Sequence, residues 1–218
     1  MTAGNSCRLQ FENFIQNAAY PCVGARSALA SEGIQIVEAT DLRAASDDAI
    51  VLDALQNFSP DNGSFRALKS LAIVFPATPS LTELQFEEYL WARLSALHER
   101  DKTRFAWDES VSADPRSPEF GMSFGGRAFY IIGMHPGSSR ASRRSPCAAL
   151  VFNPHSQFDN LRAAGLYQRF KEVIRARDIA LQGTTNPMLA DRGERSEAVQ
   201  YSGRQSEGVW TCPFSRLN

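Results

Sequence analysis

The sequence has few cysteines, and they are not arranged as a metal site or a redox pair usually is. Cys7, Cys22, Cys147 and Cys212 lie far apart and form no CxxC unit, which leaves zinc and dithiol centres without motif support. No apolar run approaches the ~18 residues that cross a bilayer, and the N-terminus lacks an apolar core of signal-peptide length. We therefore expect a cytoplasmic protein with free thiols and no contact with membranes.

The sequence also lacks an excess of either charge. Its 23 Lys and Arg residues balance 24 Asp and Glu residues, for a net charge of -1, so nucleic acid is not an expected partner. The charges are unevenly distributed, because residues 1–126 carry 10 basic and 17 acidic side chains and residues 127–204 carry 12 and 6. The basic second part suits a small anion or an anionic cofactor, and it equally fits a solvated arginine-rich surface.

Several catalytic signatures are missing. The sequence has no G-x-S-x-G elbow for a serine hydrolase, and it has neither a Walker-type phosphate loop nor a G-x-G-x-x-G dinucleotide motif after a strand. Acyl transfer, phosphoryl transfer and tight NAD binding therefore lose their usual support.

Length and composition indicate a folded protein with one core. Hydrophobic residues make up 43% of the 218 residues and charged residues 22%, which are ordinary globular values, and we predict a single domain over residues 1–218. Helices are predicted from apolar spacing at 9–19, 44–58 and 156–177, and from a capping box at Ser80–Glu83 that opens another helix. A turn is predicted at 59–63. Apolar runs predict buried strands at 71–76, 128–134 and 147–152.

These elements predict an α+β or α/β fold. We expect a central sheet of at least three strands covered by helices, with a long irregular C-terminal segment beginning near Gln182. The helix at 156–177 should be interrupted at Gly165, because glycine is unfavourable inside a helix.

The three histidines differ in their surroundings. His98 ends a predicted helix, where a cation is favoured without any further role. His135 directly follows the predicted strand 128–134, so rigid structure would hold its imidazole beside an exposed loop. His155 also follows a strand, but it opens a helix and its role could be limited to the helix start.

Arginines surround His135 in the sequence. Arg140, Arg143 and Arg144 follow it within one loop, and guanidinium groups bind carboxylates and phosphates well. A strand-end histidine with nearby arginines is the arrangement that would ligate a haem iron and hold its propionates. The alternative is that these arginines only solubilise the loop. Cys212 offers a second candidate iron ligand, or else a buried thiol among aromatic residues.

Many sequence blocks in one order, from about Phe11 to Phe214, make the chain similar to the YqcI/YcgG family. The blocks are Tyr20-Pro21-Cys22, Gly133 to Pro136 with Ser138-Ser139-Arg140 and Arg143-Arg144, Phe152 to His155 with Gln157-Phe158, Leu161-Arg162, Ile174 to Asp178, Asn186 to Leu189, Gln200 to Arg204 and Trp210 to Phe214. In one departure, Gly137 stands where we expect a larger residue, which would widen the pocket.

The resemblance implies a haem-dependent N-oxygenase that hydroxylates a nitrogen of arginine or a related guanidino or amino compound in specialised metabolism. It implies haem b, with iron, as the cofactor, oxygen or peroxide as co-substrate, and an electron donor as a possible partner. We expect His135 to ligate the iron and Arg140, Arg143, Arg144 and Ser139 to bind the cofactor, with His155 or a cysteine, Cys212 or Cys22, as alternative ligands. His155, Glu119 and Glu197 are the candidate catalytic residues, and the two carboxylates are candidates to pair with a guanidinium.

Three other functions fit the same residues. A haem sensor or carrier would need the same histidine and arginines without turnover. A non-haem iron hydroxylase would use His135 and His155 with a carboxylate such as Asp159. A domain without a cofactor would bind an anionic metabolite through the basic loop.

Overall fold

The computed structural model describes residues 6–59, 68–188, 194–206, 208 and 210–214. The turn predicted at 59–63 lies, apart from Ser59, outside these residues. The described chain forms a five-stranded mixed sheet in the order β1-β2-β5-β4-β3, in which β1 and β2 are parallel and the other neighbours antiparallel. The strands are β1 (Ile34–Glu38), β2 (Ser70–Phe75), β3 (Met122–Phe124), β4 (Arg127–Met134) and β5 (Ala148–Pro154).

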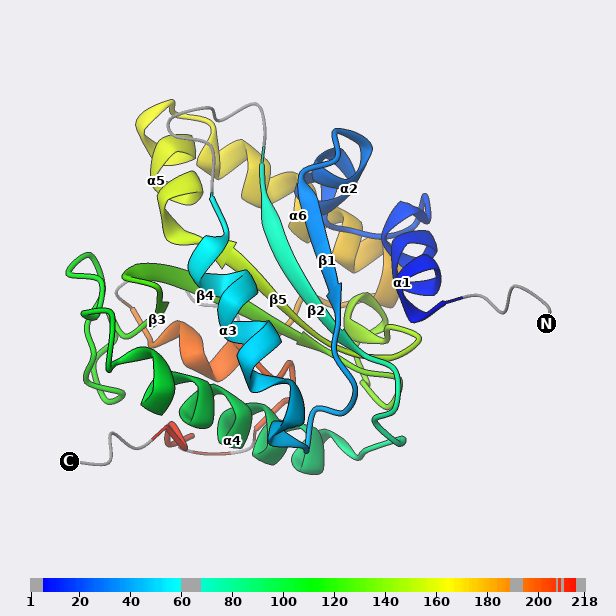
Figure 1. Cartoon of the computed structure of the whole chain (residues 1–218). Coiled ribbons are helices and arrows are strands. Elements are labelled where there is room, and N and C mark those ends of the chain that lie inside the picture. Colours follow the sequence, from blue (N-terminus) through cyan, green and yellow to red (C-terminus); the bar gives the residue numbers. More distant parts are fainter. Residues whose placement is uncertain (1–5, 60–67, 189–193, 207, 209, 215–218) are drawn as a thin grey trace.

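Two helices, α3 and α4, cover one face of this sheet (Figure 1). Phe129 and Ile131 of β4 and Leu150 and Phe152 of β5 point to this side and are completely buried. Side chains alternate between the two faces along a strand, so this set forms one continuous apolar layer. The helices are α3 (Asp48–Asn57), which follows the 3₁₀ turn η1 (Ala45–Asp47), and α4 (Glu83–Asp101).

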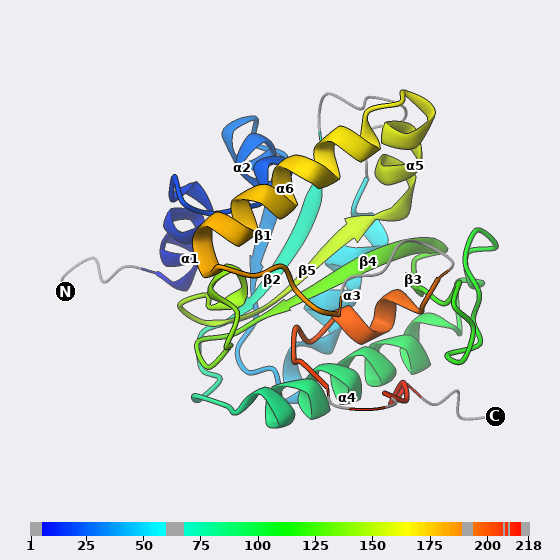
Figure 2. The ribbon, with the colours of Figure 1, turned by 180° about the vertical axis from the view of Figure 1, so that it is seen from behind.

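The opposite face is covered by helices from both ends of the chain, and α6 crosses it obliquely (Figure 2). Here Ala72, Val74 and Ala149 pack against Phe11 and Ile15 in a second, smaller core. The elements on this side are α1 (Cys7–Gln16), α2 (Val23–Ala30), α5 (His155–Ala163), α6 (Tyr167–Gln182) and the 3₁₀ turn η2 (Ala141–Arg143).

This second face is incompletely filled. Tyr130 and Ile132 of β4 and Val151 of β5 are only half-buried, although both strands have neighbours on each side. Large apolar side chains in inner strands are normally covered by the layer above them. Their exposure indicates a space between the sheet and the helices.

The predicted α+β class is confirmed. Six α-helices accompany the mixed sheet in the described part of the chain. The predicted helix over 156–177 is divided into α5 and α6, and Gly165 between them has a φ of +69°, a conformation that favours glycine. The irregular C-terminal segment carries one further 3₁₀ turn, η3 (Glu197–Gln200).

One predicted boundary was wrong. The capping box of α4 begins at Thr82 and not at Ser80. The Thr82 side chain accepts from the Gln85 backbone N–H at 3.2 Å, and Gln85 Oε1 accepts from the Thr82 backbone N–H at 3.0 Å. Thr82 and Gln85 have the same three-residue spacing as the predicted pair.

The expectation of four free thiols was also wrong, because Cys7 and Cys147 form a disulfide. The bond joins the first turn of α1 to the residue before β5, and 140 positions separate the two cysteines. Cys22 and Cys212 are free. No described helix has both the length and the apolar character that a membrane span requires.

We predict that this disulfide stabilises the fold, because it closes a long loop in the unfolded chain. Replacing Cys7 and Cys147 together by serine should lower the free energy of unfolding by about 2–5 kcal/mol, measured by urea denaturation. Cys22→Ser is the matched control and should change it far less. If reduction with dithiothreitol leaves the wild-type denaturation midpoint unmoved, the bond does not contribute to stability.

Candidate functional site

A cavity of about 320 Å³ lies between the half-covered sheet face and the helices α1, α2, α5 and α6. Its floor is formed by side chains at alternate positions of four strands. These are Ile34, Ser70, Tyr130, Ile132, Met134, Val151 and Asn153. Alternation along the strands therefore decides which residues reach the cavity and which enter the core under α3 and α4.

The cavity walls are largely apolar. Phe11 and Ile15 line it from α1, and Phe170 and Ile174 line it from α6. The helix α2 approaches α6 closely at Gly24, where an added Cβ would lie 2.7 Å from the Phe170 ring. A cavity with such walls favours a ligand with a large apolar surface.

His155 is the one histidine that lines the cavity in the described chain. It continues the alternation of Val151 and Asn153 along β5 into the first residue of α5. Its Nε2 lies 2.9 Å from Glu197 Oε1, and the same oxygen accepts a hydrogen bond from the Tyr201 hydroxyl at 2.6 Å. The chain thus holds this imidazole through a carboxylate that is itself fixed by a tyrosine.

Tyr201 reaches Glu197 from the core on the other side of the sheet. Its ring is completely buried and stacks on Trp91 of α4 at 5.6 Å. Burial, together with the negative charge of Glu197, raises the pKa of Tyr201 well above its ordinary value. The hydroxyl therefore keeps its proton and acts as a donor. Nearby, the Tyr130 hydroxyl donates to Gln200 Oε1 at 2.7 Å, and both residues line the cavity.

Arg143 brings a positive charge to the cavity wall. Its Nη1 donates to the carbonyls of Gly133 at 3.0 Å and Tyr201 at 3.1 Å, and its Nη2 donates to the Gln200 carbonyl at 2.9 Å. It forms no ion pair with a carboxylate in the described chain. Burial lowers the pKa of Arg143 below its ordinary value, so a bound anion would be stabilised here.

Three acidic residues line the cavity, and two of them already have partners. Asp178 of α6 is ion-paired with Arg140, and Glu197 accepts from His155 and Tyr201. The carboxylate of Glu119 is exposed and has no partner among the described residues. It is the acid that remains available to a cationic ligand.

The structure places His135 outside this cavity. It continues the odd-numbered positions of β4, so its ring lies on the α4 side and stacks on Phe86 with ring centroids 4.2 Å apart. It is 1% exposed, and neither ring nitrogen has a hydrogen-bond partner within the described ranges. We expected Gly137 to widen a pocket, but the chain packs tightly here. A Cβ at this position would lie 2.4 Å from the Leu81 carbonyl oxygen, so glycine leaves no open space beside His135.

The other predicted cofactor residues are dispersed. Arg140 is buried and binds Asp178 and the Thr184 carbonyl, which anchors α6 to the η2 loop. Arg144 is exposed and donates to the Ser138 and Ser139 carbonyls. Ser139 donates to Glu83 at the start of α4. Of the predicted set, only Arg143 reaches the cavity.

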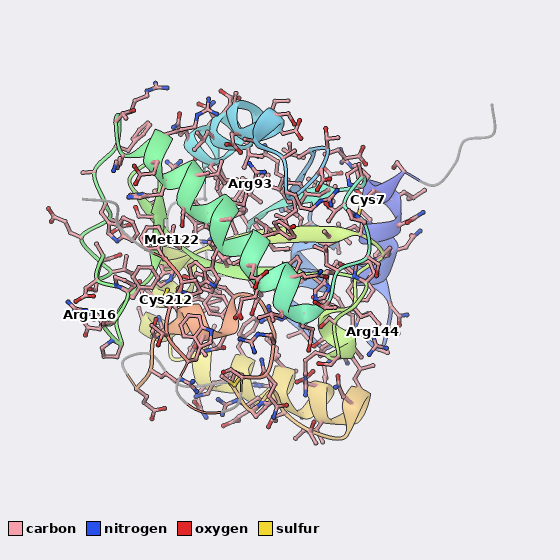
Figure 3. All side chains as sticks on the ribbon, turned by 90° about the horizontal axis from the view of Figure 1, so that it is seen from below. Cys7, Arg93, Arg116, Met122, Arg144 and Cys212 are labelled. Carbon is pink, nitrogen blue, oxygen red and sulfur yellow. A yellow bond between two sulfur atoms is a disulfide. The ribbon has the colours of Figure 1, made fainter. Side chains whose placement is uncertain are left out.

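The two free cysteines differ in position. Cys212 packs against the core under α4, and in the view of Figure 3 it lies on the opposite side of the molecule from Cys7. Burial raises the pKa of Cys212 to about 12, which disfavours a thiolate. Cys22 lines the cavity, but its sulfur accepts from the Ala25 N–H at the start of α2, and burial raises the pKa of this thiol too.

A non-haem iron site from His135 and His155 does not match this geometry, because the two rings lie on opposite faces of the sheet. Asp159, the carboxylate considered with them, forms an ion pair with Arg162 at 2.7 Å. The described ranges contain no group of three or more His, Cys, Asp or Glu side chains placed to hold a metal ion.

Sequence reasoning missed several cavity residues. Tyr130, Asn153 and Gln200 line the cavity, and Tyr201 holds Glu197 from behind. The sequence did hold a signal for Asn153. It lies two residues before His155, and residues two apart along a strand point to the same face. No local pattern connects Tyr201 to His155, because they come from different segments.

We predict that His135 makes the fold acid-sensitive. Burial lowers the pKa of His135 to about 4, from an ordinary value of 6.5. As the pH falls, the unfolded chain therefore takes up the proton before the folded chain does. The buried neutral imidazole contributes fully to the free energy of unfolding above pH 6.5, and this contribution is lost as the pH falls to about 4. The loss should reach about 3 kcal/mol.

Urea denaturation of wild type and His135→Leu between pH 4 and pH 7 tests this expectation. The variant should show a flatter dependence of unfolding free energy on pH, whatever its absolute stability. Equal slopes for the two proteins would contradict it.

Comparison with known proteins gives one family. The family model described as YqcI/YcgG matches residues 11–215, which is nearly the whole chain. No curated protein matches the chain, and no solved structure does either. The resemblance seen in the sequence blocks is thereby confirmed: the protein with this cavity belongs to the YqcI/YcgG family.

Proposed function

We propose that this protein is a haem-dependent N-oxygenase that binds haem b in the cavity and hydroxylates a nitrogen of a small guanidino or amino compound such as arginine. The observation that carries the proposal is the arrangement of His155 beside an apolar cavity whose wall includes the cation Arg143. Family membership is consistent with it.

The cavity residues fit the chemistry of a haem. A haem has a broad apolar ring, two carboxylates and an iron that needs a nitrogen or sulfur ligand. Ile132, Val151 and Phe170 offer apolar contacts. The Arg143 guanidinium, whose partners in the described part of the chain are backbone carbonyls, suits a carboxylate. These residues would hold the ring and at least one of its acidic groups.

Of the three histidines, His155 is the better candidate to hold the iron. His135 was our expectation from sequence, but its ring is enclosed between Phe86 and Gly137 on the far side of the sheet. A ligand in the cavity can reach His155 without rearranging the core. Glu197, hydrogen-bonded to His155, resembles the carboxylates that orient metal-binding imidazoles in other proteins.

Glu119 is our candidate for recognition of the substrate. A guanidinium or ammonium group in an apolar cavity needs a carboxylate partner, because an unpaired buried charge is costly. Glu197 and Asp178 are engaged elsewhere, whereas Glu119 lines the cavity without a partner among the described residues.

A haem held by His155 and Arg143 would supply the activation of oxygen, taken from dioxygen with external electrons or from peroxide, for transfer to the substrate nitrogen. The chain supplies the positioning. Glu119 orients the cationic end of the substrate, and the apolar walls exclude water. Gln200 and Tyr130, joined by a hydrogen bond at 2.7 Å, form a polar patch on the cavity wall.

The haem site is tested by reconstitution. Apoprotein mixed with haem should give a Soret band, and His155→Ala should weaken haem binding at least about tenfold, measured by absorbance titration. His135→Leu is the matched control and should bind haem as wild type does. A colourless wild-type protein would contradict the proposal, and loss of binding in His135→Leu alone would return the iron to His135.

Turnover separates an enzyme from a haem sensor or carrier. The haem-loaded protein, given peroxide or a reductant with dioxygen, should convert arginine or a related guanidine to an N-hydroxylated product detected by mass spectrometry. Glu119→Gln should raise KM about 10- to 100-fold, because it removes a charge-assisted hydrogen bond. Glu109→Gln, an exposed residue of the same loop, is the control and should leave KM unchanged. Haem binding without product would support the carrier.

A further inference from the structure

The pairing of Glu197 with two donors determines how the His155 imidazole is protonated. Glu197 Oε1 lies 2.9 Å from His155 Nε2 and 2.6 Å from the Tyr201 hydroxyl. An ionised carboxylate only accepts hydrogen bonds, so both neighbours must donate. A neutral imidazole carries its single proton on one nitrogen, and that proton is consequently on Nε2.

Tyr201 is more deeply buried than either of its partners. Its ring has no exposure and stacks on Trp91. Its hydroxyl accepts from the Met122 backbone N–H at 3.3 Å, and its carbonyl accepts from the Gly133 N–H at 2.6 Å. The Phe129 carbonyl also lies 3.3 Å from the hydroxyl, but Glu197 Oε1 at 2.6 Å is the closer acceptor and is charged when ionised, so the hydroxyl donates to Glu197.

We infer that Tyr201 is a positioning residue for the cavity histidine: it fixes the Glu197 carboxylate, which holds His155 as the Nε2–H tautomer and leaves Nδ1 as the nitrogen with a free lone pair. Nδ1 has no hydrogen-bond partner among the described residues, and the ring that carries it lines the cavity. The inference depends on the proposed function only for the use of that lone pair, as an iron ligand.

Nitrogen NMR on the apoprotein labelled with ¹⁵N-histidine tests the tautomer without any cofactor. Long-range ¹H–¹⁵N spectra at neutral pH should show His155 with a protonated Nε2 and a bare Nδ1, the signals being assigned by their absence in His155→Gln. Glu197→Ala should convert this ring to a mixture of tautomers. A protonated Nδ1 in the wild type would overturn the inference.

Tyr201→Phe tests the contribution of the hydroxyl, since it keeps the buried ring. The Nε2–H population of His155 should fall, and its NH proton should exchange faster with water. Tyr130→Phe removes a hydroxyl that binds Gln200 instead and should leave the His155 signals unchanged. Identical His155 spectra for Tyr201→Phe and wild type would remove Tyr201 from the scheme. Because no haem is added, failure of haem binding with the expected tautomer present would count only against the proposed function.

Discussion

The site depends on the alternation of side chains along β4 and β5. Each strand divides its residues between a filled face and a half-empty face, and this division is strict because the side-chain period of a strand is two. Phe129 and Phe152 thereby join the core under α4, while Tyr130 and Asn153 reach the cavity. A shift of one residue in either strand would exchange the two sets and destroy the site.

The same alternation separates two histidines that look equivalent in the sequence. His135 directly follows β4, and His155 directly follows β5. His135 is on the filled face, where its ring packs on Phe86, and His155 is on the face of the cavity. An imidazole whose two nitrogens are buried without partners is costly to charge, which suits a neutral packing role for His135 and leaves the ligand chemistry to His155.

Local patterns predicted the elements that have strong periodicity, and the remainder depends on contacts between distant segments. The predicted strands at 71–76, 128–134 and 147–152 correspond to β2, β4 and β5, which lie side by side in one sheet. The short helix α2 and the strands β1 and β3 were missed, because each is too short for its periodicity to stand out.

Among site residues, His155, Glu197, Glu119 and Arg143 were named from sequence and line the cavity. Which face of β4 and β5 borders the cavity depends on where α6 packs. No local sequence pattern predicts that position.

The C-terminal segment explains how a carboxylate on an irregular stretch of chain can hold an imidazole in place. Glu87 of α4, which is buried, accepts hydrogen bonds from Ser202 at 3.0 Å and from the Trp210 indole at 3.1 Å, and it also binds Arg204. These contacts secure the chain that follows Tyr201. A site held by loops alone is less exact than one held by helices and strands. Here α4 and β4 supply that rigidity through Tyr201, so Glu197 can act as a fixed acceptor although its own backbone belongs to a single 3₁₀ turn.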